Sequence, residues 1–181
     1  AAHYPQLLTV SRLIPTKGID SVLYALPELI KTYPHLTYTV IGQGPDRNRL
    51  VKITKNLQLQ NIVTFKGYQT QDEIVNAYNS HDLFVLLSQN KPPHIEGFGL
   101  VFLEAAACGL PSLGAHSGGI PDAIIDKKTG WLTDTTAPNT TNILSEILSS
   151  PEELKKMGQA AWENAQQKTW QNSVQKILES I

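Results

Sequence analysis

The stretch IEGFGLVFLEAAACG, residues 95–109, contains the start and almost the whole of one predicted helix, and the rest of the chain is interpreted from it. Apolar side chains recur at helical spacing between residues 100 and 110, and a run of three alanines favours a helix. A Gly-Leu-Pro run at residues 109–111 ends it. We therefore expect the helix to begin near Phe98 or Gly99.

The start of this helix has the properties of an anion site. The first amides of a helix have no partner inside it and point toward whatever lies in front. Gly97 and Gly99 allow a ligand to approach the backbone closely. The helix dipole favours negative charge at this end, so the sequence predicts a phosphate group there.

Two glutamates lie on either side of the predicted helix start. Glu96 precedes the helix, and Glu104 lies about one to two turns inside it, where a carboxylate can accept hydrogen bonds from hydroxyl groups. A simpler interpretation is that Glu96 caps the helix and Glu104 is solvated. Because Leu103 and Ala105 flank Glu104 in an apolar helix, we expect little room for a solvated face and favour a binding role.

Composition limits the class of protein. A chain of 181 residues suits one domain with a sizeable core. Lys and Arg number 15 against 16 Asp and Glu, so the net charge of −1 gives no reason to expect nucleic acid or an anionic membrane surface. The single cysteine, Cys108, excludes an internal disulfide, and we expect a reducing, cytoplasmic location. The chain has no signal peptide and no apolar run long enough to span a bilayer.

Apolar runs alternate with helical patterns, which predicts an α/β fold: a Rossmann-like, doubly wound parallel sheet of about six strands. The predicted strands are residues 6–11, 36–41, 62–65, 83–87, 111–115 and 130–132. The predicted helices include residues 19–33 and 72–79, the central helix, and extra C-terminal helices from residue 139 to the end with a break at 149–151. Pro27 should kink or split the first helix, and Pro45 should occupy the first turn of the helix after the second strand.

In such sheets, ligands bind beyond the carboxyl ends of the strands. The loops at those ends are residues 11–17, 42–45, 66–69, 88–99 and 115–119. Arg12 and Lys17 share the first loop, where Arg offers a fork to phosphate oxygens and Lys a point charge, although a solvated surface pair remains the alternative. Gly42 begins a Gly-rich turn that lacks the full dinucleotide fingerprint.

Metal chemistry has no support in the sequence. The five histidines show no metal-ligand spacing, and the single cysteine adds no ligand pair. No Asp-x-Asp pair is present for Mg²⁺ or Mn²⁺. We therefore expect neither a metal nor a cofactor.

The ordered motifs resemble those of a known family. They are VSRLIPTKG (10–18), VIGQGP (40–45), FKG (65–67), EGFGLVFLEA (96–105) and GGIPD (118–122). Together they resemble the C-terminal half of the family-four (group 1) retaining glycosyltransferases of GT-B fold, over nearly the whole chain. The resemblance implies that residues 1–181 form the nucleotide-sugar donor-binding domain, with the acceptor domain absent from this chain.

The resemblance also implies roles for individual residues. Arg12 and Lys17 would hold the diphosphate and Glu96 would contact the transferred sugar, which makes these three the catalytic candidates. The donor-binding candidates are Glu104 for the ribose hydroxyls, Gly97, Phe98, Gly99, Leu100 and Val101 for sugar and phosphate, the backbone near Gly67 and Tyr68 for the base, and Gly42.

Two departures from the family pattern bear on the substrates. Ser11 replaces the more usual Gly before Arg12, and the segment 89–94 is longer than in many members. Similar longer loops occur in members that resemble lipid mannosyltransferases, which favours a lipid or polysaccharide acceptor. The donor is expected to be a UDP-, GDP- or ADP-sugar.

The expected activity is retaining hexosyl transfer to a lipid, saccharide or small-molecule acceptor, once the chain is joined to its N-terminal acceptor domain. The isolated chain is expected to be inactive, and contact with the inner face of a membrane would come through the other domain. A stand-alone nucleotide-binding module, or a donor subunit completed by a separate acceptor chain, is the alternative. A dehydrogenase domain is disfavoured because the dinucleotide fingerprint is missing.

Overall fold

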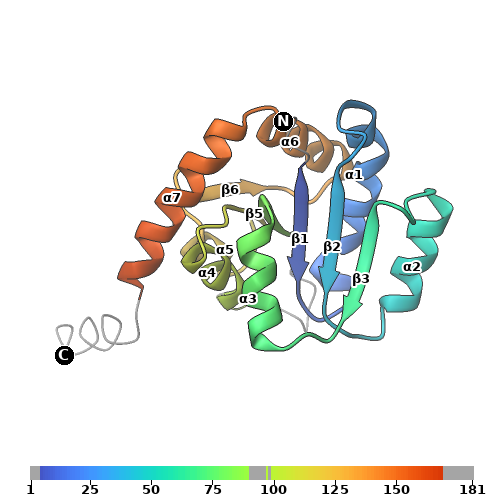
Figure 1. The fold of residues 1–181 in the computed structure, drawn as a ribbon, viewed down its shortest axis with the longest axis horizontal. Helices are drawn as coiled ribbons and strands as arrows, with labels where there is room; N and C mark the ends of the chain where they lie inside the picture. The colour runs from blue at the N-terminus through green and yellow to red at the C-terminus, as the bar shows by residue number, and fades with distance from the viewer. Residues whose placement is uncertain (1–4, 90–96, 98, 169–181) are drawn as a thin grey trace.

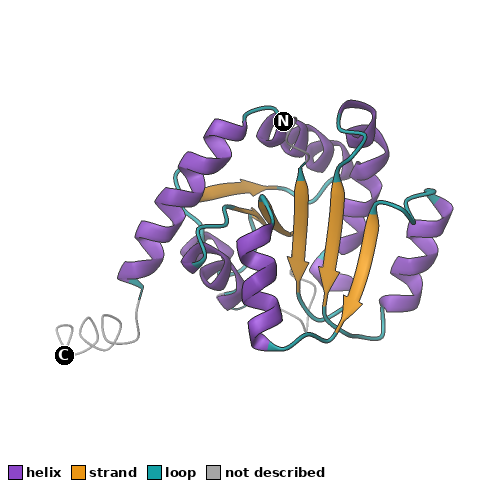
Figure 2. Ribbon diagram, in the orientation of Figure 1, coloured by secondary structure: helices purple, strands orange, loops and turns teal. Residues whose placement is uncertain are grey.

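The described chain forms a parallel sheet between two layers of helices (Figure 1, Figure 2). The computed structural model describes residues 5–89, 97 and 99–168. The strands are β1 (Gln6–Val10), β2 (Thr37–Ile41), β3 (Val63–Gly67), β4 (Leu83–Leu86), β5 (Ser112–Ala115) and β6 (Gly130–Thr133). All pair in parallel, in the order β3-β2-β1-β4-β5-β6. The predicted doubly wound α/β sheet is confirmed.

The helices divide between the two faces of the sheet. They are α1 (Ile19–Thr32), α2 (Arg47–Asn56), α3 (Gln71–Ser80), α4 (Leu100–Ala107), α5 (Ile120–Ala123), α6 (Ala137–Leu148) and α7 (Pro151–Gln167), with a 3₁₀ turn η1 (Pro15–Lys17). Buried side chains of α1, α2 and α6 share one apolar cluster, and those of α3, α4 and α5 share the other.

The strands supply both clusters because neighbouring side chains in a strand point to opposite faces. In β1, Leu7 packs on the α1 side and Leu8 on the α4 side, and both are fully buried. Buried on both faces, the strands appear in the sequence as continuous apolar runs rather than alternating ones. The strands therefore form a packed central layer, and the loops that follow them start from this layer.

Two of the proline predictions need correction. Pro27 lies inside α1, which continues as a single helix to Thr32, so the predicted split is wrong and the predicted kink stays a prediction. Burial of Val22 and Leu29 on either side of it holds the helix against the sheet. Pro45 precedes α2 instead of lying in its first turn, because the amide of Arg47 donates to Gly44 and closes a turn around it.

The central helix ends as predicted. Gly109 adopts the left-handed conformation, with φ of 73°. Its amide donates to Ala106 and that of Leu110 to Ala105, the two bonds of a Schellman motif. The break at residues 149–151 is also confirmed, because it separates α6 from α7. The predicted continuation of helix beyond residue 168 lies outside the described residues.

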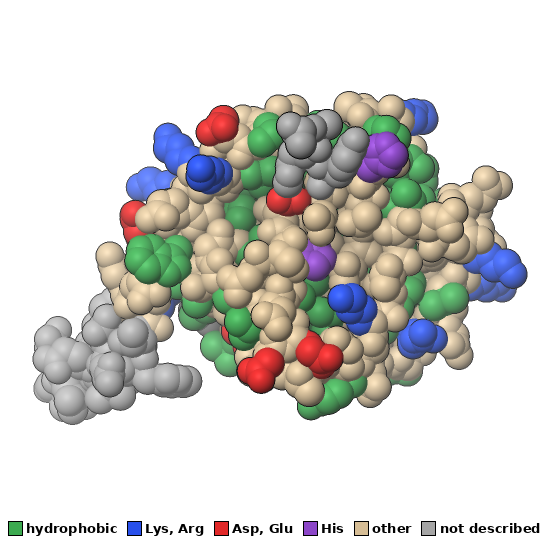
Figure 3. All heavy atoms as spheres, in the orientation of Figure 1, with side chains coloured by type: hydrophobic (Ala, Val, Ile, Leu, Met, Phe, Trp, Pro, Cys, Tyr) green, Lys and Arg blue, Asp and Glu red, His purple; other side chains and the backbone are tan. Residues whose placement is uncertain are grey.

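The order of the strands reverses between β1 and β4, because the chain winds outward from β1 to β3 and then returns to the other side of β1. Such a switch point leaves a crevice at the carboxyl ends of the two strands. Acidic and basic side chains are interspersed over the face in Figure 3. Among the described residues, each helix is too short or too polar to cross a bilayer.

Candidate functional site

A cavity of about 350 Å³ lies at this switch point. Its lining comes from the end of β1, from η1, from the end of β4 and from the first turn of α4: Val10, Ser11, Arg12, Lys17, Leu86, Gly99, Leu100 and Val101. Two cationic side chains thus face the start of a helix across a small cavity. The structure brings together five of the predicted site residues: Arg12, Lys17, Gly99, Leu100 and Val101.

Backbone contacts fix the two sides of the cavity relative to each other. The amide of Gln89, after β4, donates to the carbonyl of Thr16 in η1 at 2.7 Å. Gly18 follows η1 with φ of 65°, and a Cβ there would lie 2.1 Å from the carbonyl oxygen of Leu87. Only glycine fits this close approach. The loop that carries Arg12 and Lys17 is therefore clamped directly onto the end of β4.

The first turn of α4 has the electrostatic properties of an anion site. Gly99 is the N-cap, with φ of 72°, and it provides no side chain to cap the helix. The first turn of α4 contains no acidic residue. The amides of the first turn therefore keep their partial positive charge toward the cavity, where Arg12 and Lys17 add two full charges.

Glu104 lies on the solvent-exposed side of α4, so the prediction that this helix leaves little room for a solvated face is wrong. Leu100, Glu104 and Ala107 are all exposed and lie about one turn apart on one stripe. The short helix packs its other side, including Phe102 and Ala105, against the sheet. Oε2 of Glu104 accepts a hydrogen bond from the hydroxyl of Tyr78 at 3.0 Å.

Gly42, Gly67 and Tyr68 lie apart from the cavity lining, at the ends of β2 and β3. The amide of Gly42 donates to the carbonyl of Gly67 at 2.7 Å, and a Cβ on Gly42 would lie 1.9 Å from the carbonyl oxygen of Ser11. Gly42 thus lets the loops after β1 and β2 pack together. Tyr68 is 72% exposed. The roles predicted for Gly67 and Tyr68 stay predictions.

Some of the predicted site lies outside the described residues. Glu96 and Phe98 belong to that group, and so does most of the longer segment 89–94. Gly97 is described and exposed. In the described ranges, His, Cys, Asp and Glu side chains form no group of three that could hold a metal ion.

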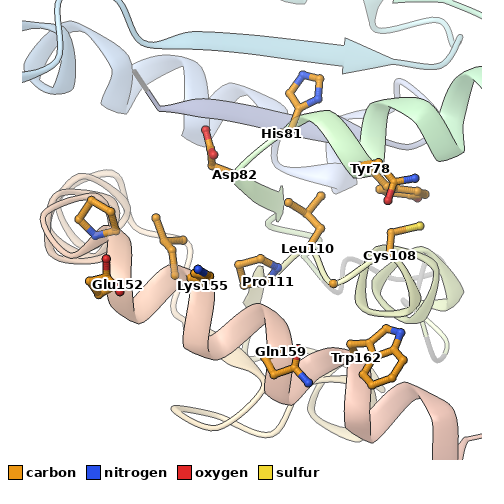
Figure 4. A pocket seen from close by; sticks show the side chains of 14 residues that line it. Tyr78, His81, Asp82, Cys108, Leu110, Pro111, Glu152, Lys155, Gln159 and Trp162 are labelled. Carbon is orange, nitrogen blue, oxygen red and sulfur yellow. The ribbon is translucent and has the colours of Figure 1, made fainter. Parts of the chain in front are cut away.

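A larger cavity, of about 660 Å³, opens at the opposite edge of the sheet, between α3, α7 and the turn before β5 (Figure 4). Several of its polar side chains already have partners within the chain. His81 bonds with Ala77 and Thr39, and Asp82 accepts from the amide of Gln6. Among the other lining residues, Asn79 donates to Val75 and Gln159 to Glu163. The bonds of His81 and Asp82 reach β2 and β1, and those of Asn79 and Gln159 stay within one helix. Because these polar groups already have partners, we place the functional site at the smaller cavity.

Sequence reasoning missed Tyr78, which the structure connects to Glu104. A tyrosine near the end of an amphipathic helix gives no signal beyond that of a core residue. The contribution of Leu86 to the cavity was also missed, because only the strand order shows that β4 ends beside β1.

Comparison with known proteins shows which family the chain matches. The family model described as glycosyl transferases group 1 matches residues 2–164. A GDP-mannose-dependent alpha-(1-6)-phosphatidylinositol monomannoside mannosyltransferase from Mycolicibacterium smegmatis is 32% identical over 159 residues, which cover 86% of this chain and 42% of the relative. The chain thus spans less than half the length of that relative.

Solved structures share the fold. The C-terminal domain of a glycosyl transferase group 1 family protein (LpcC) from Francisella tularensis superposes with a TM-score of 0.78 at 26% identity, covering 91% of this chain and 87% of that one. Sucrose-phosphate synthase from Thermosynechococcus elongatus superposes with a TM-score of 0.84 at 25% identity, covering 97% of this chain and 44% of that one.

Proposed function

Because the chain belongs to the glycosyl transferases group 1 family, we propose that it is the donor-binding half of a retaining glycosyltransferase. It would bind a nucleotide-diphospho-sugar, and the complete enzyme would transfer the hexose to a lipid, saccharide or small-molecule acceptor. The acceptor would be held by a second domain, since the mannosyltransferase relative is more than twice as long as the matched region.

The convergence of Arg12, Lys17 and the first turn of α4 on one cavity supports this proposal. A diphosphate needs several donors and positive charge in a small volume. Arg12 supplies a bidentate fork, Lys17 a point charge, and α4 its free amides. The position at the switch point of a doubly wound sheet is also where such folds bind nucleotides.

The same groups fit the chemistry of transfer. The bond between the anomeric carbon and the phosphate oxygen breaks, which leaves negative charge on the diphosphate while the sugar gains oxocarbenium character. Arg12, Lys17 and the α4 amides would stabilise that leaving group electrostatically. The acceptor oxygen bonds to the anomeric carbon and its proton passes to the leaving phosphate, with retention of configuration. In this proposal no metal is needed.

The remaining predicted residues complete the donor site. Glu104 would accept hydrogen bonds from the ribose hydroxyls, and the backbone at Gly67 and Tyr68 would meet the base. Glu96 would contact the transferred sugar. Since the mannosyltransferase relative depends on GDP-mannose, GDP is the first nucleotide to test, beside UDP and ADP. A cytoplasmic protein that contacts the inner face of a membrane through its second domain would suit a lipid acceptor.

Calorimetric titration of the chain with GDP, UDP and ADP tests the donor site. At least one should bind, with a Kd of about 0.1–1 mM because half of the site is absent. Arg12→Gln and Lys17→Gln should each weaken binding by about tenfold, since each substitution removes a positively charged side chain that would pair with the diphosphate. Arg47→Gln is the control, because Arg47 is exposed on α2, away from the cavity lining.

Addition of EDTA should leave these affinities unchanged. A requirement for Mg²⁺ or Mn²⁺ would contradict the assignment of the diphosphate to Arg12, Lys17 and α4 alone. Absence of heat and of chemical-shift changes with all three nucleotides would contradict the donor site itself.

A further inference from the structure

A hydrogen bond between Tyr78 and Glu104 joins α3 to α4. Tyr78 also lines the larger cavity, and neither residue is in the lining of the smaller one. The Tyr78 hydroxyl, from α3, donates to Oε2 of Glu104, from α4, at 3.0 Å. The two residues differ sharply in exposure: Tyr78 is 1% exposed, whereas Glu104 is an exposed residue. A fixed donor therefore holds an otherwise mobile carboxylate.

Tyr78 is fixed by an aromatic row that consists of Tyr78, Phe84 and Phe102. The rings of Tyr78 and Phe84 meet edge to face, with centroids 5.8 Å apart. Phe84 and Phe102 meet in the same way at 5.4 Å. All three rings are buried, so the row has little freedom to move.

The aromatic row also reaches the start of α4. A Cβ on Gly99, the N-cap of α4, would lie 2.8 Å from Cδ2 of Phe102. The row therefore connects the position of the Tyr78 hydroxyl with the position of the first turn of α4. The partner of Glu104 and the amides that face the cavity are thus held by one rigid unit.

Glu104 lies on the exposed stripe that begins at the cavity. Leu100 lines the cavity, and Glu104 follows it by one turn on the same side of α4. A carboxylate can accept about four hydrogen bonds. Among the described residues, the Tyr78 hydroxyl donates to Oε2 of this carboxylate and not to Oε1. Oε1 is therefore available to a ligand.

The Tyr78 hydroxyl keeps its proton over the working pH range. Burial raises the pKa of Tyr78 well above its usual value, and the negative charge of Glu104 raises the pKa further. The hydroxyl thus acts as a constant donor. Holding the Glu104 side chain before the ligand arrives reduces the rotamer entropy that is lost on binding.

We propose that Tyr78 is a positioning residue for the donor's ribose. Its hydroxyl holds Oε2 of Glu104 while Oε1 accepts hydrogen bonds from the ribose hydroxyls. This inference rests on the proposed function, because it assumes that a nucleotide occupies the cavity. It assigns Tyr78 an effect on the ribose only, and none on the diphosphate.

The substitution Tyr78→Phe tests the proposal, since it keeps the ring and removes the hydroxyl. Three ligands are titrated: the tightest-binding of GDP, UDP and ADP, its 2′,3′-dideoxy analogue, and pyrophosphate. Tyr78→Phe should weaken the nucleoside diphosphate by about five- to tenfold. The dideoxy analogue and pyrophosphate should bind the variant as they bind the unaltered chain, which also shows that the cavity is still folded. In a Glu104→Gln background, Tyr78→Phe should cause little further loss.

Tyr38→Phe is the matched control. Tyr38 is 0% exposed on β2, and its hydroxyl also makes a buried hydrogen bond, with Thr9 at 2.7 Å. It packs in the cluster on the α1 side of the sheet. This substitution removes the same atom and should leave the affinity for all three ligands unchanged.

Other outcomes overturn the inference in distinguishable ways. Equal affinity of Tyr78→Phe and the unaltered chain for the nucleoside diphosphate would refute the positioning role while the donor site stands. Equal loss for all three ligands would show that Tyr78 supports the fold of the site rather than the ribose contact. Failure of the unaltered chain to bind any nucleotide would refute the proposed function, and this inference with it.

Discussion

Glu104 and Glu96 are expected to act at different stages of the reaction. Glu104 is exposed on the α4 stripe that starts at the cavity, and it has a fixed partner in Tyr78. Glu96 lies outside the described residues, four positions before Leu100 in the sequence. If Glu104 accepts bonds from the ribose, its charge contributes to binding of the nucleotide itself. If Glu96 contacts the transferred sugar, its contribution arises only when that sugar is present.

We therefore predict that Glu104→Gln weakens nucleoside diphosphate binding by about 1.5–3 kcal/mol, because a charged acceptor is lost. Glu96→Gln should leave that affinity nearly unchanged and lower turnover in the enzyme that contains both halves. Titration calorimetry measures the first effect and steady-state kinetics the second. Equal loss of nucleotide affinity in both variants, with unchanged melting temperatures, would refute this division of roles.

Gly42 is better explained by packing than by ligand contact. A Cβ at this position would lie 1.9 Å from a backbone oxygen of Ser11, and φ is 128°. We predict that Gly42→Ala destabilises the fold by at least about 2 kcal/mol, which lowers the melting temperature by about 4–8 °C. Gly109→Ala is the control: φ is also positive, at 73°, but a Cβ there meets nothing within 4 Å. It should cost only about 1–2 kcal/mol. Equal melting temperatures for the two variants would contradict the steric explanation.

At the scale of elements, the sequence predicted the strands and long helices well. The strands are buried on both faces, so each appears as an uninterrupted apolar run, as in β4 (Leu83–Leu86). The short elements η1 and α5 were missed, because three or four residues are too few to show a period. Pro27 does not split α1, since tertiary burial of that helix outweighs the loss of one backbone bond.

A half-buried histidine, His81, links the end of α3 to β2. Nδ1 of His81 bonds with the carbonyl of Ala77 at 2.7 Å, and Nε2 with the hydroxyl of Thr39 at 3.0 Å. Burial lowers the pKa of His81 below its usual value. Lys66 lowers the pKa too, whereas the Ala77 carbonyl and Asp82 act in the opposite direction. The folded state therefore takes up this proton at a lower pH than the unfolded state does.

In the unfolded chain the pKa of His81 is about 6.5. His81 therefore stabilises the folded state above that pH, and this contribution is lost as the pH falls below it. We predict that the free energy of unfolding decreases between about pH 7.5 and pH 5.5, and that His81→Gln makes the decrease smaller. Denaturant titrations at several pH values measure it. His116→Gln, at an exposed position, should keep the original slope. An unchanged slope in His81→Gln would mean that His81 titrates alike in both states.

At the scale of the whole molecule, the sequence predicted that Arg12, Lys17 and Gly99 lie at the same edge of the sheet, but only part of how their cavity is assembled. Parallel strands place all their following loops at one edge, so Arg12, Lys17 and Gly99 were expected there. That β1 and β4 are neighbours depends on the strand order, which no local pattern encodes. The exposed side of α4 was missed for a similar reason. An apolar helix of eight residues gives no sign of which side faces the sheet until its neighbours are known.

The last prediction follows from the size of the chain relative to its family. The cavity of about 350 Å³ provides two cationic side chains and a helix start suited to a diphosphate, and we propose that the acceptor is held by a second domain. An active glycosyltransferase must bring donor and acceptor together and exclude water from the reacting carbon. We therefore predict that the isolated chain binds a nucleoside diphosphate without transferring sugar.

A protein that contains this chain and an N-terminal acceptor domain should bind the same nucleotide more tightly and transfer the sugar. Arg12→Gln should then lower both the nucleotide affinity and the rate of transfer. Arg12 would stabilise the negative charge of the diphosphate in the bound donor and in the transition state. Calorimetry and a radiolabelled sugar-transfer assay on both proteins provide the comparison. Sugar transfer by the isolated chain at the rate of the longer protein would show that these residues hold the acceptor themselves, and the assignment of the chain as one half of the enzyme would be wrong.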